Sequence, residues 1–414
     1  MHSADVTTNW AGNHRYGAGR LHRPRSLREV QEIVAAASKV HVLGSRHAFN
    51  AIADSDELVS LDGLPADVAI NRDAATVSFS AGLTYGALAT ALNEEGLALA
   101  NLASLPHISV AGAIATATHG SGDGNGNLAG SVAGLELVTS DGNVITAARG
   151  DTDFDGLVVS LGAVGALTRL TLDVEPAYHV GQRTFEALPW NELFEHFDEI
   201  TASGYSVSLF TRWGPAVDQV WIKSRATDAA RETLFGARAA TVDRHPILGL
   251  DSANVTPQLG NAGLWSDRLP HFRMGFTPSS GEELQSEYFV AREHAIAAIE
   301  AIRRIADHVR PLLQVSEIRT IASDRLWLSP QYEQDTVGLH FTWRREPEAV
   351  MAALGHVETA LAPFAPRPHW AKLFLADAGA ISARYARLPD FVELRERYDP
   401  RGAFRNRWLE THVL

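Results

Sequence analysis

Two short segments place polar residues at a spacing that suits a binding site. Glu317 and Arg319 lie two positions apart in one apolar stretch, and so do His340 and Thr342 in another. Residues two apart in a β-strand point to the same side of the sheet. If the two faces meet, a carboxylate, a guanidinium, an imidazole and a hydroxyl converge on one cavity. The same alternation is typical of the solvent-facing side of an antiparallel sheet, and the residues alone favour that second interpretation.

A second candidate is the turn Gly44-Ser45-Arg46-His47, which follows the apolar residues Val40–Leu43. A turn of this kind can aim several backbone N–H groups into one concavity, which suits a phosphate or pyrophosphate. An ordinary strand-to-loop turn with a surface histidine is the alternative, and the stretch alone favours it.

Small residues dominate the run from Ala103 to Gly122, which contains Ser104-Leu105-Pro106-His107-Ile108-Ser109 and Thr116-Ala117-Thr118-His119. Small side chains and glycines allow a backbone to approach a large flat or phosphorylated ligand closely. The run matches neither a P-loop nor the glycine fingerprint of dinucleotide-binding folds. A flexible loop is the alternative.

Lysine is rare in this chain. Only Lys39, Lys223 and Lys372 occur among 36 basic residues. A lysine retained where arginine is the rule could supply a compact ammonium whose pKa can shift. Lys372 stands beside His369 and Trp370, which makes it the strongest candidate of the three. A solvated lysine at a domain edge would also be compatible with this local sequence.

The elements that must position these residues fall into two blocks. The first alternates: the pattern predicts a helix from Ser26, strands over 39–43 and 76–81, a helix from Thr84, a hairpin over 135–147, and a short helix and strand over 154–174. The second block predicts strands over 205–213, 219–223, 315–321 and 336–343, a helix over 296–309, a long loop over 246–280, and a tail over 383–414 that is helical and then irregular. Hairpins with flanking helices favour an α+β domain with an antiparallel sheet, and Glu175-Pro176 is the expected boundary.

Composition excludes several classes of function. The chain has 414 residues and a formal net charge of −13, so binding to nucleic acid is not expected. It has no cysteine, which excludes disulfides, thiolate nucleophiles, iron–sulfur clusters and cofactors tethered through sulfur. We find neither a basic-then-apolar leader near the start nor an apolar run long enough to span a membrane. The expectation is a cytoplasmic monomer that binds no membrane.

Taken together, these stretches resemble the alditol oxidases (xylitol oxidases) of the vanillyl-alcohol oxidase superfamily of flavoproteins. The resemblance extends over nearly the whole chain. It rests on the segments Asn9–Asn13, Gly44–His47, Ala103–Gly112, Tyr205–Thr211, Leu269–Arg273, Glu317–Thr320, His340–Trp343, Arg367–Trp370 and Asp399–Asn406. The residues of 227–245 and 246–280 match this family least well.

The resemblance implies an α+β architecture: a two-subdomain FAD-binding domain and a substrate domain with a large antiparallel sheet flanked by helices. The implied division is 1–175 for FAD, 176–374 for substrate, and 375–414 returning to the FAD domain. It also implies a covalent bond from His47 to the 8α-methyl group of the flavin. The implied FAD contacts are Val42, Leu43, Gly44, Ser45, Arg46, His47, Ala48, Ser104, Ser109, Gly112, Thr116, Ala117, Thr118, His119, Leu167 and His369.

The implied reaction is FAD-dependent oxidation of a terminal alditol hydroxyl, with O2 reduced to hydrogen peroxide. Ser104, Glu317, Arg319, Thr342 and Lys372 match positions that contact the polyol, with His340 beside them. Arg319 and Lys372 would stabilise the developing alkoxide, and His340 is the candidate proton acceptor. Ala103 would lie at the flavin edge where O2 arrives. We expect no metal site.

Two alternatives stay open. One is a sugar-lactone (aldonolactone) oxidase or dehydrogenase, which would use the same cofactor. The other is a metal-dependent hydrolase with Glu317, His340 and His369 as ligands, although no pair of these has a local metal-ligand spacing such as His-Glu-x-x-His.

Overall fold

The computed structural model describes residues 8–275 and 283–414. A small parallel sheet at one end contains β1 (Arg20–His22), β3 (Glu57–Val59) and β2 (Val40–Val42), in that order. Helix α1 (Leu27–Ala36) begins at the predicted Ser26, whose hydroxyl accepts a hydrogen bond from the Glu29 N–H. Strand β2 ends at the turn that carries His47, so this sheet positions the turn.

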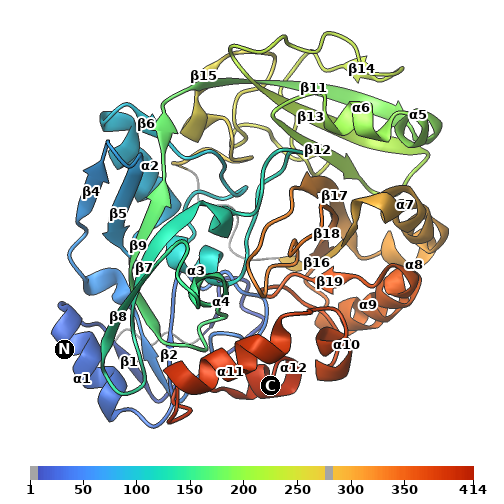
Figure 1. Cartoon of the computed structure of the whole chain (residues 1–414). Helices are drawn as coiled ribbons and strands as arrows, with labels where there is room; N and C mark the ends of the chain where they lie inside the picture. Colours follow the sequence, from blue (N-terminus) through green and yellow to red (C-terminus); the bar gives the residue numbers. More distant parts are fainter. Residues whose placement is uncertain (1–7, 276–282) are drawn as a thin grey trace.

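A five-stranded antiparallel sheet lies beside the parallel sheet (Figure 1). Its order is β4 (Val68–Asn71), β5 (Thr76–Ser80), β9 (Ala166–Asp173), β7 (Val132–Val138) and β8 (Val144–Ala148). The same part of the chain holds α2 (Tyr85–Glu94), β6 (Leu97–Ala98), α3 (Val110–Ala115), α4 (Phe154–Val158) and β10 (Glu175–Pro176). These elements confirm the predicted strand over 76–81, the helix after Thr84, the hairpin over 135–147, and the helix and strand within 154–174.

The third sheet is the largest, with nine strands among the described residues. Its order is β14 (Arg238–Ala239), β11 (His179–Pro189), β13 (Ala216–Arg225), β12 (Ser206–Thr211), β17 (Leu313–Ile321), β18 (Thr336–Arg344), β16 (Glu283–Ala291) and β19 (Arg367–Pro368), and β15 (Gly263–Leu264) pairs with β11. Helices α5 (Trp190–Glu195), α6 (Phe197–Thr201), α7 (Ala295–Arg304), α8 (Ala306–Val309) and α9 (Pro347–Leu361) flank it (Figure 1). The predicted α+β class with a large antiparallel sheet is confirmed.

The structure differs from the sequence-based expectation in several elements. The apolar stripe over 296–309 forms two helices, because the chain turns at Ile305, whose N–H bonds the carbonyl of Ile302 three residues back. Strands β11 and β16 were not predicted. The tail forms one more helix than expected, since Asn406 caps a new helix by accepting a hydrogen bond from the Leu409 N–H. The predicted loop over 246–280 is irregular up to β15, and its last residues, 276–280, lie outside the described part.

The C-terminal helices α10 (Ala378–Ser382), α11 (Leu388–Tyr398) and α12 (Arg407–His412) return to the N-terminal part of the molecule (Figure 1). The Val40 N–H donates to the carbonyl of Ala403 at 2.8 Å, and the amide of Asn406 donates to the carbonyl of Ile52 at 2.8 Å. Residues near the C-terminus therefore pack against β2 and against the segment that follows its turn.

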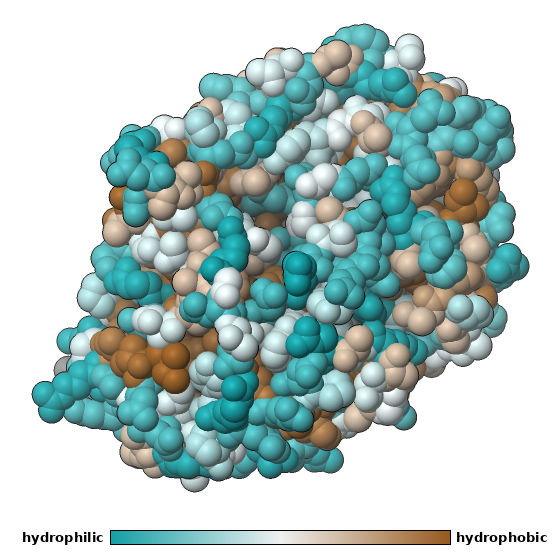
Figure 2. Space-filling view, in the orientation of Figure 1, coloured by the Kyte–Doolittle hydropathy of each residue, from teal (hydrophilic) through white to brown (hydrophobic). Residues whose placement is uncertain are grey.

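The described helices include none that is both long and apolar enough to cross a bilayer. The face drawn in Figure 2 is largely hydrophilic, and its apolar side chains gather in small separate groups.

Candidate active site

The turn after β2 and the loop before α3 lie against each other at very short range. The Ser109 N–H donates to the Ser45 hydroxyl at 2.9 Å, and the Ser45 N–H donates to the Ser109 hydroxyl at 3.3 Å. A Cβ at Gly44 would lie 2.3 Å from the Ser109 Oγ, so any side chain there would displace this hydroxyl from its hydrogen bond with the Ser45 N–H. Arg46 has a φ of +64°, in the left-handed region, and this bend turns the chain into the cavity described below.

His47 projects from this turn with no hydrogen-bond partner on either ring nitrogen among the described residues, and both nitrogens are buried. Its ring stacks on Trp10, with centroids 5.3 Å apart and planes 21° apart, and His107 lies at 5.4 Å. Burial, and secondarily His107, lower the pKa of His47 to about 4, so the ring is neutral and nucleophilic at neutral pH. An orphaned neutral imidazole in a preset orientation fits a residue that bonds a cofactor.

One face of the large sheet carries the polar residues singled out in the sequence. Across neighbouring strands, Phe210 lies opposite Glu317, Glu317 lies opposite His340, and His340 lies opposite Glu287. Directly opposed residues of antiparallel strands point to the same side. Glu317, Arg319, His340 and Thr342 are each less than 10% exposed. The solvent-facing interpretation of these strands is therefore wrong: both sides of the sheet are covered.

Glu287 on β16 is the charged residue at the centre of this face, and the sequence analysis missed it. It is fully buried, and its carboxylate accepts from Lys372 Nζ at 2.5 Å and from Arg319 Nη2 at 2.8 Å, with His119 Nε2 at 3.2 Å. Burial raises the pKa of Glu287, but the charges of Lys372, Arg319 and His119 more than offset this and hold it well below its ordinary value. Glu283, Gln285 and Glu287 alternate along the strand, and this signal could have revealed it.

Glu317 has two charged or polar neighbours besides His340. His271 Nε2 lies 2.9 Å from its Oε1, and Arg319 Nε lies 3.6 Å away. Burial raises the pKa of Glu317, but Arg319 and His271 hold it well below the usual range, so the group is a carboxylate. His271 belongs to the long loop over 246–280, and no local signal marked it as part of the site beyond its place in the segment Leu269–Arg273.

His340 is oriented by one neighbour and leaves one nitrogen free. Its Nε2 lies 3.2 Å from the Gln285 amide oxygen, whereas its Nδ1 is buried and has no partner among the described residues. Burial and the charge of Lys372 lower its pKa well below 6.5. The ring is therefore neutral, with its hydrogen on Nε2 and a lone pair on Nδ1.

A single cavity of about 960 Å³ joins the turn, the loop and the polar sheet face. This volume is near the upper end for ligand pockets, which leaves room for a large cofactor and a small substrate together. Every residue expected to contact cofactor or substrate lines it, except Ala117. Ala117 is fully buried at a φ of +52° within the hydrophobic core, so it shapes the loop from behind.

The residues at the two ends of the cavity differ in chemistry. At the end near His47, backbone N–H groups, hydroxyls and small residues prevail, as in Gly44, Ser45 and Gly112, and these suit the phosphates of FAD. At the end near the large sheet, Glu317, Arg319, His340, Thr342 and Lys372 suit a polar substrate. Ser104 lies at the same end of the cavity, since its carbonyl accepts a hydrogen bond at 3.2 Å from the N–H of His271, the neighbour of Glu317.

Within the described residues one group has donor atoms close enough to hold a metal ion, namely His119, Glu287 and His369. It shares only His369 with the set considered from the sequence. The carboxylate of Glu287 already forms ion pairs with Lys372 and Arg319. A metal dication at this position would therefore be repelled by two positive charges unless it displaced them. This charge balance disfavours the metal-dependent hydrolase.

Comparison with known proteins agrees with this geometry. The model of a family described as FAD binding domain matches residues 19–148, and that of D-arabinono-1,4-lactone oxidase matches residues 281–412. Cholesterol oxidase from B. sterolicum superposes with a TM-score of 0.79 at 16% identity, covering 98% of this chain and 96% of its own. The fold is that of the vanillyl-alcohol oxidase type, and the protein is an FAD-dependent oxidoreductase.

An alditol oxidase from Streptomyces sp. is 49% identical over 409 residues, covering 98% of both chains. An L-gulono-1,4-lactone dehydrogenase from Mycobacterium tuberculosis is 27% identical over 97% of both chains, and an L-gulonolactone oxidase from Mus musculus is 25% identical over 97% of both. The chain therefore belongs to the alditol oxidase family.

Proposed function

We propose that this protein oxidises the terminal primary hydroxyl of an open-chain alditol, such as xylitol or sorbitol, to the aldehyde of the aldose. The overall reaction is R–CH2OH + O2 → R–CHO + H2O2. The observation that carries the proposal is the buried polar face at one end of the cavity. There the Nδ1 of His340 and the Nε of Arg319 have no hydrogen-bond partner among the described residues.

The cofactor would be FAD, held by the turn Val42–Ala48 and by Ser104, Ser109, Gly112, Thr116, Thr118, His119, Leu167 and His369, with Ala117 behind the loop. When bound, its flavin ring supplies the acceptor for the two electrons of the substrate C–H bond. We propose a covalent 8α-histidyl bond through His47, which the unpartnered, neutral ring at the cavity wall supports.

The residues of the polar face have three different roles toward the substrate: charge stabilisation, proton acceptance and binding of hydroxyl groups. Arg319 and Lys372 stabilise the negative charge that develops on the reacting oxygen, since fixed cations in a water-poor site act far more strongly than in water. His340 accepts the hydroxyl proton at Nδ1, where its lone pair is free. Ser104, Glu317 and Thr342 bind the remaining hydroxyls.

The arrangement of these groups favours a chain over a ring. Donors and acceptors from β17 and β18 form a row, and an extended polyol offers one hydroxyl per carbon to such a row. A compact lactone leaves several of them unpaired, at about 1–3 kcal/mol for each buried orphan. An aldonolactone oxidase or dehydrogenase is the second candidate, favoured by the family model over residues 281–412 and by the relatives at 25–27% identity.

One preparation tested on xylitol, sorbitol, glycerol and gulono-1,4-lactone separates the two candidates. We expect kcat/KM to be highest for xylitol or sorbitol, and to be much lower for glycerol because fewer hydroxyls find partners. A higher kcat/KM for the lactone, or equal values for glycerol and xylitol, would overturn the proposal.

We further propose the division into an FAD-binding part (1–175), a substrate-binding part (176–374) and a C-terminal segment (375–414) that returns to the first. The change from the five-stranded to the nine-stranded sheet between β9 and β11 supports the first boundary. The contact of Ala403 with Val40 supports the return. The cytoplasmic location and the monomeric state stay predictions from the sequence.

A further inference from the structure

Lys223 is buried beneath the polar face and takes no part in the chemistry proposed above. It lies on β13, is 1% exposed, and is surrounded by acceptors from the long loop. Its ammonium donates to the carbonyl of Leu269, to that of Pro270 at 3.2 Å, and to His271 Nδ1 at 3.2 Å. An ammonium has three hydrogens, so these three acceptors account for all of them.

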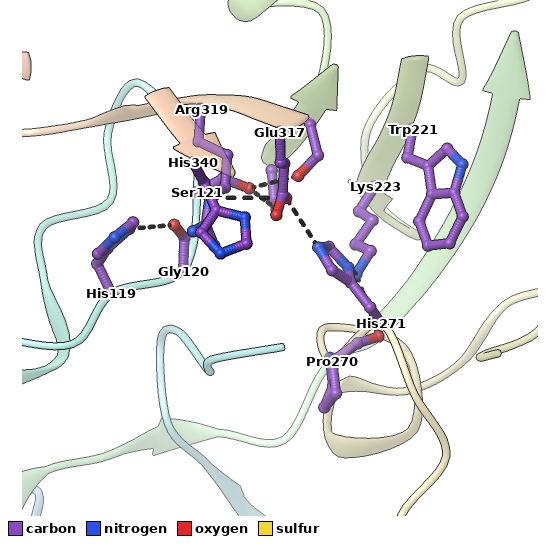
Figure 3. A network of polar contacts seen from close by, with 12 residues as sticks. His119, Gly120, Ser121, Trp221, Lys223, Pro270, His271, Glu317, Arg319 and His340 are labelled. Carbon is purple, nitrogen blue, oxygen red and sulfur yellow. Dashed lines mark hydrogen bonds and ion pairs between the residues drawn. The ribbon is translucent and has the colours of Figure 1, made fainter. Parts of the chain in front are cut away.

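His271 connects this lysine to the substrate end of the cavity (Figure 3). Because its Nδ1 accepts from Lys223, its hydrogen lies on Nε2, which donates to Glu317 Oε1 at 2.9 Å. The edges of Phe210 and Trp221 hold the ring, with centroids 5.5 Å and 5.3 Å away. The tautomer and the plane of the ring are therefore both fixed.

We propose that Lys223 and His271 are positioning residues which, through a buried relay Lys223–His271–Glu317, fix the orientation and the negative charge of Glu317 for a substrate hydroxyl. The inference rests on the proposed function, because it takes Glu317 as a substrate-binding group. The same relay attaches the segment Leu269–His271 to the sheet beside the cavity.

The ionisation of the relay agrees with this geometry. Burial lowers the pKa of Lys223 to about 7, although Glu317 raises it. Burial, together with the positive charges of Lys223 and Arg319, lowers the pKa of His271 to about 4, although Glu317 raises it. The charged and titratable groups that face the relay are Glu317 and Arg319 from β17 and His340 from β18. Loss of the Lys223 charge should raise the pKa of His271 toward its ordinary value.

The first test is Lys223→Met, an apolar replacement of similar length, in the flavin-loaded enzyme. We expect the KM for xylitol to rise about tenfold or more, because His271 is no longer held by Lys223 as the donor to Glu317, while kcat changes less. The acidic side of the pH profile of kcat/KM should also move to higher pH, because the pKa of His271 rises from about 4 when the positive charge of Lys223 is lost. The matched control is Lys39→Met, which also removes a lysine donor to a carbonyl, that of Gly402, but lies outside the cavity. It should leave KM and the pH profile unchanged.

A double-mutant cycle separates a relay from a structural role. In a Glu317→Gln background, Lys223→Met should add little, since the group through which it acts is already changed. Additive effects on KM, or an unchanged KM in a folded, flavin-loaded Lys223→Met enzyme, would overturn the relay. If Lys223→Met does not fold, His271→Gln and His271→Leu replace it: glutamine can still donate to Glu317 and should keep a lower KM than leucine. Equal KM values for the two would also overturn it.

Each KM of a variant is divided by the KM of the wild type, measured with whichever substrate the wild type turns over. Failure of the proposed function appears separately, as a wild type that prefers the lactone, and leaves the test of the relay intact.

Discussion

Replacing Glu287 by glutamine should destabilise the protein and weaken its active site together. The carboxylate is fully buried and has Lys372 at 2.5 Å and Arg319 at 2.8 Å. Two unit charges about 4 Å apart interact by about 4 kcal/mol at an effective dielectric constant of 20. Glutamine has nearly the same shape, so the change removes charge with little loss of volume, and it leaves two cations facing each other without their anion.

The expected loss is about 3–5 kcal/mol in the free energy of unfolding, the range found when one partner of a buried ion pair is removed. The full Coulomb energy of two pairs would be larger, but water and side-chain rearrangement offset part of it. The pKa of Glu287 is well below the 4.5 of the unfolded chain, so its stabilisation is fully present above pH about 4.5 and is lost as the pH falls through the folded value. The difference between wild type and variant should therefore shrink on acidification.

The Glu287→Gln substitution should also change the pH dependence of the rate of flavin reduction. Burial lowers the pKa of Lys372, and the negative charge of Glu287 raises it, so the variant's lysine should lose its proton at a lower pH. The basic limb of the rate of flavin reduction should move to lower pH accordingly. Glu32→Gln, at an exposed pair with Arg28 on α1, is the control and should change neither stability nor profile. A Glu287→Gln enzyme with wild-type denaturation and an unmoved basic limb would refute this reasoning.

Three further outcomes are expected. After acid precipitation and washing, the wild-type pellet should stay yellow and that of His47→Ala should become colourless; a colourless wild-type pellet contradicts the covalent bond. Lys372→Arg keeps the charge but changes its shape and hydration, so stopped-flow should show flavin reduction slower by about tenfold, or about 1.4 kcal/mol; an unchanged rate removes the special role of lysine. Because the small residue Ala103 lines the cavity, air should reoxidise the flavin rapidly and peroxide should equal product, whereas turnover only with artificial acceptors would indicate a dehydrogenase.

Short-range spacing was sufficient for several features of the site. The two-residue spacing of Glu317 with Arg319, and of His340 with Thr342, predicted that each pair shares a face, and the pleat of a strand enforces this wherever the strand lies. The strand that ends in Gly44-Ser45-Arg46-His47 was predicted in the same way. The motifs were also sufficient to indicate the family, because different matching segments are distributed along nearly the whole chain.

The burial of these groups, and the strands that lie side by side, were decided by the tertiary structure. Glu317 lies opposite His340 because of the register of β17 and β18, and Glu287 lies opposite His340 because β16 pairs on the other side. Lys372 reaches Glu287 because β19, just before it, adds to β16 at the sheet edge. Sequence spacing says nothing of such pairings, since they join residues far apart in the chain.

Lys223 and His271 show the same division most clearly. In the sequence, Lys223 is one of three lysines and His271 is a histidine in a predicted long loop. Neither has a local pattern that indicates a contact with Glu317. Only the packing of the segment Leu269–His271 against the sheet brings the three side chains together, 2.9 Å and 3.2 Å apart at their contacts. The sequence by itself determined the local periodicity and the kinds of chemical group available. Long-range packing decided which groups lost water and met, and that loss of water gives their charges their strength.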